Sequence, residues 1–194
     1  GGDHTCALDD DQQIACWGKN DDGQASPPEG EFIQISAGTF HSCAIRSTGL
    51  VDCWGRNDDG QASPPDSIFT RISAGSFHTC GILESGSIEC WGRNDDGEAT
   101  APDGSFRSVS AGARHSCAAS TSGELQCWGY DADDRTSPPS GIFSDVEAGA
   151  GHTCGLAEDD GGSSVPNVQC WGFDYFGQTT PPDVLFVQAT AGST

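Results

Sequence analysis

Methionine is absent from this chain, basic residues are scarce, and long apolar runs are missing. No apolar segment approaches the length of a membrane-spanning helix, so we expect no insertion into a membrane. No basic and apolar leader precedes the first repeat motif. We therefore expect a mature domain or a piece of a longer protein.

Eight Lys and Arg stand against 29 Asp and Glu, and the formal net charge is -21. Such a surface repels the phosphates of DNA and RNA, so we expect no nucleic-acid partner. Cationic partners and divalent metal ions are the ligands that a negatively charged surface would attract. The alternative is that the charge only keeps a soluble protein monomeric.

Catalytic motifs and helical periodicity are missing too. The sequence has no nucleophile elbow, phosphate loop or metalloprotease helix. Carboxylates are plentiful enough for a glycosidase, but they recur in turns instead of as one singular pair. Because the motifs are missing and the acids recur, we expect no enzyme. No segment sustains a helical apolar period, so we also expect almost no helix.

A repeat of 37 residues organises the chain. Each unit contains a His-x-Cys motif followed by a Cys-Trp-Gly motif. The last step between Cys-Trp-Gly motifs is longer, which indicates an insertion within 158–168. The His-x-Cys motifs begin at His4, His41, His78, His115 and His152, and the Cys-Trp-Gly motifs begin at Cys16, Cys53, Cys90, Cys127 and Cys170.

Each unit contains three strand signals. In the second unit they are residues 32–37, 41–46 and 50–55, which are bounded by Gly, Ser, Thr and Asn turn residues. A Pro pair at 64–65 limits a fourth short segment, which suits the outer edge of a sheet. Such a unit matches one blade of a β-propeller.

The two ends of the chain are offset by one strand. The first unit lacks the segment that forms the first strand in the other units. A segment of the same pattern, FVQATA, follows the fifth unit at residues 186–191. We predict an all-β, five-bladed β-propeller, closed by this strand completing the first blade, because closure removes exposed sheet edges. Residues 1–194 then form one domain and a monomeric ring; the alternative is a fragment of a larger ring. The units begin near residues 1, 38, 75, 112 and 149.

The second unit reads AGTFHSCA at 37–44 and, after Gly49, CWGRNDDGQ at 53–61. This pattern resembles the regulator-of-chromosome-condensation repeat family along the whole chain. The resemblance implies a propeller and protein binding, although the family ring usually has seven blades and a longer repeat. Paired cysteines are typical of its secreted bacterial-type members. The nuclear member acts on a small GTPase and on chromatin, and the negative charge here argues against both roles.

Ten cysteines form five pairs. Folded about a tight turn, Cys43 and Cys53 lie opposite each other at a Cα distance of about 4.5–5.5 Å, which a disulfide spans. The even count and regular spacing predict an oxidising compartment, so we expect a secreted, periplasmic or cell-surface protein. The predicted disulfides are Cys6–Cys16, Cys43–Cys53, Cys80–Cys90, Cys117–Cys127 and Cys154–Cys170.

Zinc is the alternative use of these cysteines. His41, Cys43 and Cys53 would share a strand face and offer three ligands, but no fourth ligand recurs at a fixed offset. We therefore expect each His to bond a neighbouring backbone group. The five Trp point to the opposite face, where we expect them in the core between blades, with sugar-stacking platforms as the alternative.

An Asn-Asp-Asp-Gly loop follows Cys-Trp-Gly in three units. We interpret it as a turn, because Asn and Asp bond their own backbone and Gly takes positive φ. Carboxylates also suit calcium, but the pattern decays in the last two units, so we expect no metal and no cofactor. The calcium alternative rests on Asp21, Asp22, Asp58, Asp59, Asp95 and Asp96.

The residues just before each repeat His vary, and they belong to loops that should open on one end of the ring. Aromatic and Arg side chains at this position are types enriched at protein interfaces. We predict a partner-binding patch here; the alternative is that the two Phe fill gaps between blades. The candidates are Asp3, Phe40, Phe77 and Arg114.

These observations predict a non-enzymatic, secreted or surface-exposed scaffold that binds a protein or peptide of cationic character. The alternative from another class is a multivalent, lectin-like carbohydrate-binding propeller. The third hypothesis is a hydrolase or lyase that uses the central channel.

Overall fold

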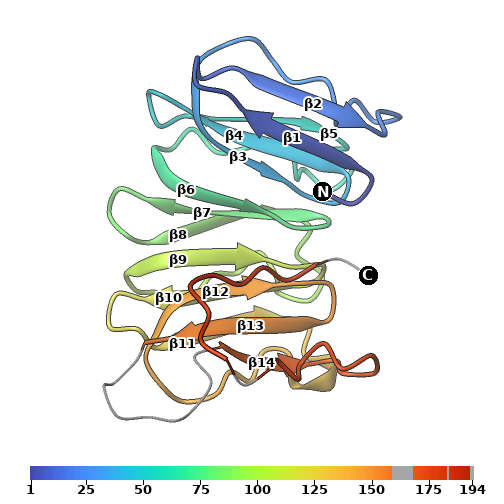
Figure 1. Ribbon diagram of the computed structural model, residues 1–194. Helices are drawn as coiled ribbons and strands as arrows, with labels where there is room; N and C mark the ends of the chain where they lie inside the picture. The colour runs from blue at the N-terminus through green and yellow to red at the C-terminus, as the bar shows by residue number, and fades with distance from the viewer. Residues whose placement is uncertain (159–167, 183, 193–194) are drawn as a thin grey trace.

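The computed structural model describes residues 1–158, 168–182 and 184–192, and the described chain is built from β-strands (Figure 1). The first strands of the units are β3 (Phe32–Ala37), β6 (Phe69–Ala74), β9 (Phe106–Ala111) and β12 (Phe143–Ala148). The middle strands are β1 (His4–Leu8), β4 (His41–Arg46), β7 (His78–Leu83), β10 (His115–Ser120) and β13 (His152–Ala157). The third strands are β2 (Ile14–Gly18), β5 (Val51–Gly55), β8 (Ile88–Gly92), β11 (Leu125–Gly129) and β14 (Val168–Gly172).

These strands form five antiparallel sheets. Four sheets have three strands in chain order, and the first has only β1 and β2. The expectation of almost no helix is confirmed, since the described residues add one 3-10 turn, η1 (Ala132–Asp134). No helix in the described part of the chain is long and apolar enough to cross a membrane. The expected insertion within 158–168 lies mostly outside the described residues.

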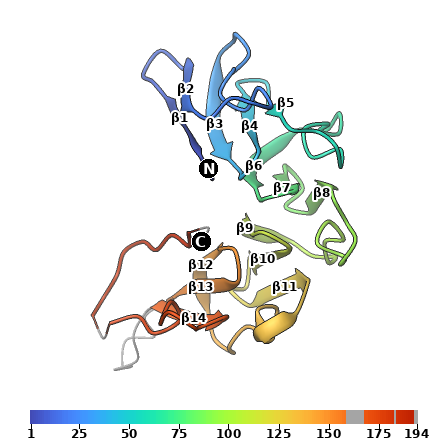
Figure 2. The ribbon, with the colours of Figure 1, turned by 90° about the vertical axis from the view of Figure 1, so that its right-hand side faces the viewer.

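The five sheets follow one another around a common centre, where Gly1 and Gly192 lie (Figure 2). The inner ends of the units line one cavity of about 240 Å³. Its wall includes Gly1, Gly38, Gly75, Gly112, Gly149 and Gly192. The first strands therefore converge on an axis, as the blades of a propeller do.

Backbone hydrogen bonds join neighbouring units at this axis. In four of the units, the residue after the repeat Gly donates its N–H to the carbonyl of the following repeat Gly, at 3.1 to 3.3 Å. A Cβ on Gly75 would collide with the carbonyl oxygen of Gly112. Glycine is required here because two backbones approach so closely. The bonded pairs are Thr39–Gly75, Ser76–Gly112, Ala113–Gly149 and Ala150–Gly192.

The predicted closure is not confirmed. Within the described residues, β1 pairs with β2 alone, and residues 184–192 contain no strand. Val187, Gln188 and Ala189 instead line a small cavity with β12 and β13. The C-terminal segment thus lies beside the fifth sheet, in the position that each first strand takes beside the sheet before it, and it leaves the edge of β1 uncovered.

Candidate functional site

All five predicted disulfides are confirmed. The paired cysteines face each other directly in the register of the middle and third strands, with Cα distances of 4.0 to 4.1 Å. Because all ten cysteines are bonded, none offers a thiolate to a metal. The zinc alternative is therefore wrong.

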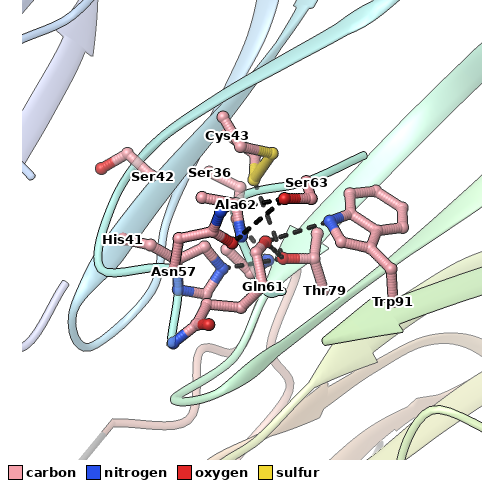
Figure 3. The surroundings of a disulfide bond; sticks show 12 residues. Ser36, His41, Ser42, Cys43, Asn57, Gln61, Ala62, Ser63, Thr79 and Trp91 are labelled. Carbon is pink, nitrogen blue, oxygen red and sulfur yellow. Dashed lines mark hydrogen bonds between the residues drawn. A yellow bond between two sulfur atoms is a disulfide. The ribbon is translucent and has the colours of Figure 1, made fainter. Parts of the chain in front are cut away.

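The repeat histidines join neighbouring sheets through hydroxyl groups, so the expected backbone partner is wrong. His41 Nε2 lies 2.7 Å from Thr79 Oγ1 of the next unit (Figure 3). Thr79 in turn donates its hydroxyl proton to the carbonyl oxygen of Gln61, at 3.3 Å. The hydroxyl must therefore accept from Nε2–H, while the buried Nδ1 has no hydrogen-bond partner. The same bond recurs as His4–Ser42, His78–Ser116 and His115–Thr153, at 2.7 to 2.8 Å.

The carbonyl of Gln61 accepts a second donor. The indole Nε1–H of Trp91 reaches it at 3.0 Å (Figure 3). The Gln61 side chain is itself fully buried, and its Oε1 accepts from the backbone N–H of Asp59 at 2.9 Å. One loop residue thus anchors both a hydroxyl and an indole of the next unit. Equivalent indole bonds join Trp54 to Gln24, Trp128 to Glu98 and Trp171 to Arg135, each at 2.9 Å.

The expected burial of the five Trp holds only where a preceding sheet covers them. Trp54 and Trp91 are 9% and 8% exposed, and Trp128 and Trp171 are half-buried. Trp17 is 55% exposed, because no described sheet precedes the first unit.

The acidic loops are turns organised by asparagine. Asn57 Oδ1 accepts from the N–H of Ala62 at 2.9 Å, and its Nδ2 donates to Ser63 at 2.9 Å (Figure 3). Asn20 and Asn94 repeat this geometry. Nowhere in residues 1–158, 168–182 and 184–192 do three His, Cys, Asp or Glu side chains lie together as a metal site would need. The loop acids proposed for calcium therefore do not converge.

The structure brings two of the partner-binding candidates into contact. Phe40 and Phe77, from neighbouring units, have ring centroids 5.3 Å apart and are half-buried. The guanidinium of Arg56 lies 5.5 Å and 5.9 Å from these two rings, and that of Arg93 lies 5.6 Å from Phe77. The two Phe thus pack between units, as the gap-filling alternative expects, and also present part of their surface, so the partner-binding patch stays a prediction.

Arg114 continues this row in the next unit. Its Nε and Nη2 donate to Asp96 at 2.9 Å and 2.7 Å, and its guanidinium lies 4.3 Å from the centre of the Tyr130 ring. The fourth candidate, Asp3, pairs instead with Lys19 at 3.8 Å. We call Phe40, Arg56, Phe77, Arg93, Arg114 and Tyr130 the loop-end strip.

Three members of the loop-end strip were missed from the sequence. Arg56, Arg93 and Tyr130 each follow a Cys-Trp-Gly motif, at a position that varies between units as the residue before each His does. A cluster in the fifth unit was missed too: Tyr175 and Phe176 are 79% and 76% exposed and lie edge to face at 4.8 Å. In both cases the signal in the sequence was a position whose residue differs between units while the surrounding repeat motif stays the same.

The family comparison agrees with this geometry. The model of the regulator of chromosome condensation (RCC1) repeat matches residues 1–24, 32–61, 69–98 and 106–134, which is more than half of the chain. The chain belongs to the RCC1-repeat family. No curated protein matches it.

Solved structures with RCC1-like folds resemble this family member. The ectodomain of the Physcomitrella patens receptor kinase CR4 is 32% identical, with a TM-score of 0.82 over 99% of this chain and 55% of that one. The ectodomain of the Arabidopsis thaliana receptor kinase ACR4 is 30% identical, with a TM-score of 0.70 over 89% and 61%. Prp20p of Saccharomyces cerevisiae is 17% identical, with a TM-score of 0.73 over 89% and 56%, and shares the fold. The chain thus spans little more than half the length of these structures.

Acid should destabilise the protein through its buried histidines. Burial, followed by neighbouring charged groups, lowers the pKa of His41 and His115 to about 4 and that of His78 to about 3. Since these values lie below the unfolded value, their contribution is complete above about pH 6.5 and is lost as the pH falls through 6.5 toward 4. Each such histidine should lower the unfolding free energy by about 1.4 kcal/mol per pH unit in that range.

Urea unfolding at several pH values measures this slope. Glu147 opposes it, because burial and then Asp145 raise its pKa to about 7, so that its protonation stabilises the fold between about pH 7 and 4.5. Because three histidines oppose one carboxyl, the net unfolding free energy should still fall as the pH is lowered. His78→Gln should remove about one proton from the slope; an unchanged slope would contradict the assignment.

The indole bond between units can be tested with a matched pair of variants. Trp54→Phe removes the donor to the Gln24 carbonyl inside a buried contact and should destabilise the protein by about 1–3 kcal/mol. Trp17→Phe is the matched variant: with the indole 55% exposed, as in the open arrangement of this structure, the change should cost less than about 0.5 kcal/mol. Chemical unfolding of the two variants compares them, and equal losses would mean that Trp17 is also covered.

Proposed function

We propose that this RCC1-repeat chain is a non-enzymatic scaffold that binds a protein or peptide through its loop-end strip. The proposal rests on the contacts within the strip. Three aromatic rings alternate with three guanidinium groups along consecutive units: the rings of Phe40, Phe77 and Tyr130, and the guanidinium groups of Arg56, Arg93 and Arg114. Aromatic and Arg side chains dominate binding energy at protein interfaces. The disulfides, histidines and buried Trp hold the frame, whereas the strip occupies positions that the frame leaves open.

Two other functions find less support. A multivalent lectin would need its repeated Trp as sugar platforms, but Trp54 and Trp91 are buried against the preceding sheet. A hydrolase or lyase in the central channel would need acids or nucleophile–base pairs there. The axial cavity is lined by Gly, Ala, Ser and Thr residues.

We place this binding function in an oxidising compartment, outside the cell or at its surface. Five disulfides in one small domain persist in such compartments. The similar CR4 and ACR4 structures are receptor ectodomains. The negative charge favours a partner with a cationic surface.

The strip is tested by removing its two Phe rings together. Phe40→Ala/Phe77→Ala should weaken binding of a partner isolated from the extracellular fraction by covalent crosslinking about tenfold or more, because both are central aromatic contacts. The matched control is Ile33→Ala/Ile142→Ala, which removes exposed apolar side chains in β3 and just before β12. Isothermal titration with folded variants gives the affinities. Equal affinities for both double variants would rule out the strip.

We also propose that residues 186–191 complete the first sheet and close a five-bladed ring. Every first strand reads Phe-x-x-x-x-Ala, and FVQATA at 186–191 keeps this pattern. An uncovered β1 edge and an exposed Trp17 are the surfaces that such a strand and the fifth sheet would cover.

Amide exchange of β1 tests closure. Cys6 and Cys16 are 4.1 Å apart at Cα, which fits a non-hydrogen-bonded pair, so the N–H groups of Cys6 and Leu8 point to the free edge. Closure should slow their exchange to the rates of Cys43 and Ile45, which β3 covers. Fast exchange of both, with the protected β4 amides as the internal reference, would mean that the ring is open.

A further inference from the structure

The outer edge of the second sheet has no strand beside it. β5 is the last strand of this sheet and lies on its outer side (Figure 2). Propeller blades typically have four strands, and the fourth lies outside the third. Residues 56–68, which follow β5 and contain the Pro pair at 64–65, form no strand. The short edge segment expected from the sequence therefore leaves β5 uncovered.

The register of the disulfide shows which backbone groups of β5 point outward. Cys43 and Cys53 are 4.1 Å apart at Cα, which fits a non-hydrogen-bonded pair. The N–H and C=O groups of Val51 and Cys53 therefore point away from β4. On that side they bond to no group in the part of the chain that the structure describes. Such a row of free groups is a template for another strand.

A groove of about 330 Å³ follows this edge. Four consecutive residues of β5, 51–54, line it, together with Pro28 of the preceding unit and Pro64 of the same unit. The indole of Trp54 is fixed there by its bond to the Gln24 carbonyl at 2.9 Å. Proline rings are apolar and have no N–H, so they do not compete for the free groups of β5. Free backbone groups between apolar walls suit an extended chain that adds to the sheet.

Acidic residues flank the two prolines. Glu29 directly follows Pro28, Asp66 lies two residues after Pro64, and both acids are exposed. Asp52 also lines the groove, but the guanidinium of Arg46 already pairs with it. Together with the net charge of -21, the two exposed acids attract positive side chains of a bound segment.

We propose that β5 binds an extended, basic segment of a partner protein, which adds to the second sheet as a fourth strand. The segment pairs its N–H and C=O groups with those of Val51 and Cys53. Its apolar side chains pack against Pro28, Trp54 and Pro64. None of these residues belongs to the loop-end strip, so the proposal does not depend on the proposed function and gives the scaffold a second binding surface.

The probe is the capped peptide acetyl-Lys-Val-Thr-Val-Lys-amide, added at saturation to isotopically labelled protein. It should slow hydrogen exchange of the Val51 and Cys53 amides about tenfold or more, because both become hydrogen-bonded. The amides of Ile14 and Cys16 are the matched reference, since they occupy the same positions of β2, which no described unit precedes. Equal slowing at β2 and β5 would overturn the groove, because it would show that any free edge binds the peptide.

Methylation of the peptide nitrogens tests strand pairing without altering the protein. Alternate N–H groups of a strand point to the same side. One control peptide is therefore methylated on both valine nitrogens and the other on the threonine nitrogen. One of them should bind about tenfold more weakly or worse, and the other should keep its affinity. Equal affinities of the two would overturn the added strand, because their side chains and charges are the same.

Charge variants test the acids beside the groove. Glu29→Lys/Asp66→Lys should weaken the peptide about threefold or more. Asp10→Lys/Glu124→Lys, the same charge change at exposed acids elsewhere, should alter the affinity less than about twofold. Equal losses would refute the site, because they would indicate charge attraction alone.

Sedimentation of the protein without peptide tests a different occupant, a second copy of this chain. A monomer with fast exchange at the edge amides of β5 is the expected result. A dimer in which these amides are protected would assign the edge to self-association and would overturn the proposal.

Discussion

The fold depends on a single backbone carbonyl that accepts two donors from the next unit. Gln61 shows the arrangement: its carbonyl takes the Thr79 hydroxyl and the Trp91 indole, and the same hydroxyl accepts from His41. These groups are buried, so leaving any of them without its partner would cost about 1–3 kcal/mol. Each acidic loop is thereby fixed against the sheet that follows it, and the row of loops acquires a defined spacing.

That spacing explains why the loop ends can differ in sequence in so small a unit. A three-stranded sheet has little core of its own, and a cross-strand disulfide adds about 2–3 kcal/mol in the chain-entropy model. Stability is thus supplied by the cysteines, the histidine–hydroxyl bonds and the axial glycines. The residues before each His and after each Cys-Trp-Gly take no part in the disulfides, the histidine–hydroxyl bonds or the axial glycine contacts. They differ as Phe40, Phe77 and Arg114 do, although the carbonyl of each accepts the same backbone hydrogen bond, from the residue that follows Cys-Trp-Gly, at 2.9 to 3.0 Å.

Local spacing made much of this structure predictable. The strands and all five disulfides follow from distances of ten to sixteen residues along the chain, within one sheet. The Thr79 partner of His41, the carbonyl of Gln61 and the place of Arg56 in the strip depend on contacts between sheets. Those contacts are set by the rotation from one unit to the next, which no repeat length specifies. The predicted closure depended on the same unknown rotation, and it is the part of the fold that the described residues do not confirm.

One buried side chain connects the frame to the strip. Glu98 stands where other units carry Gln24 and Gln61, and its Oε2 accepts from the N–H of Asp96 at 2.8 Å, so the turn is kept. Its other oxygen lies 3.7 Å from Nε of Arg93, which stacks on Phe77. The exchange of Gln for Glu therefore keeps the turn hydrogen bond and adds a longer contact with Arg93, whose closer partner is Asp95 at 2.8 Å. A substitution inside the frame thus adds a contact to the strip and keeps the turn, so the loop ends can differ between units that share one fold.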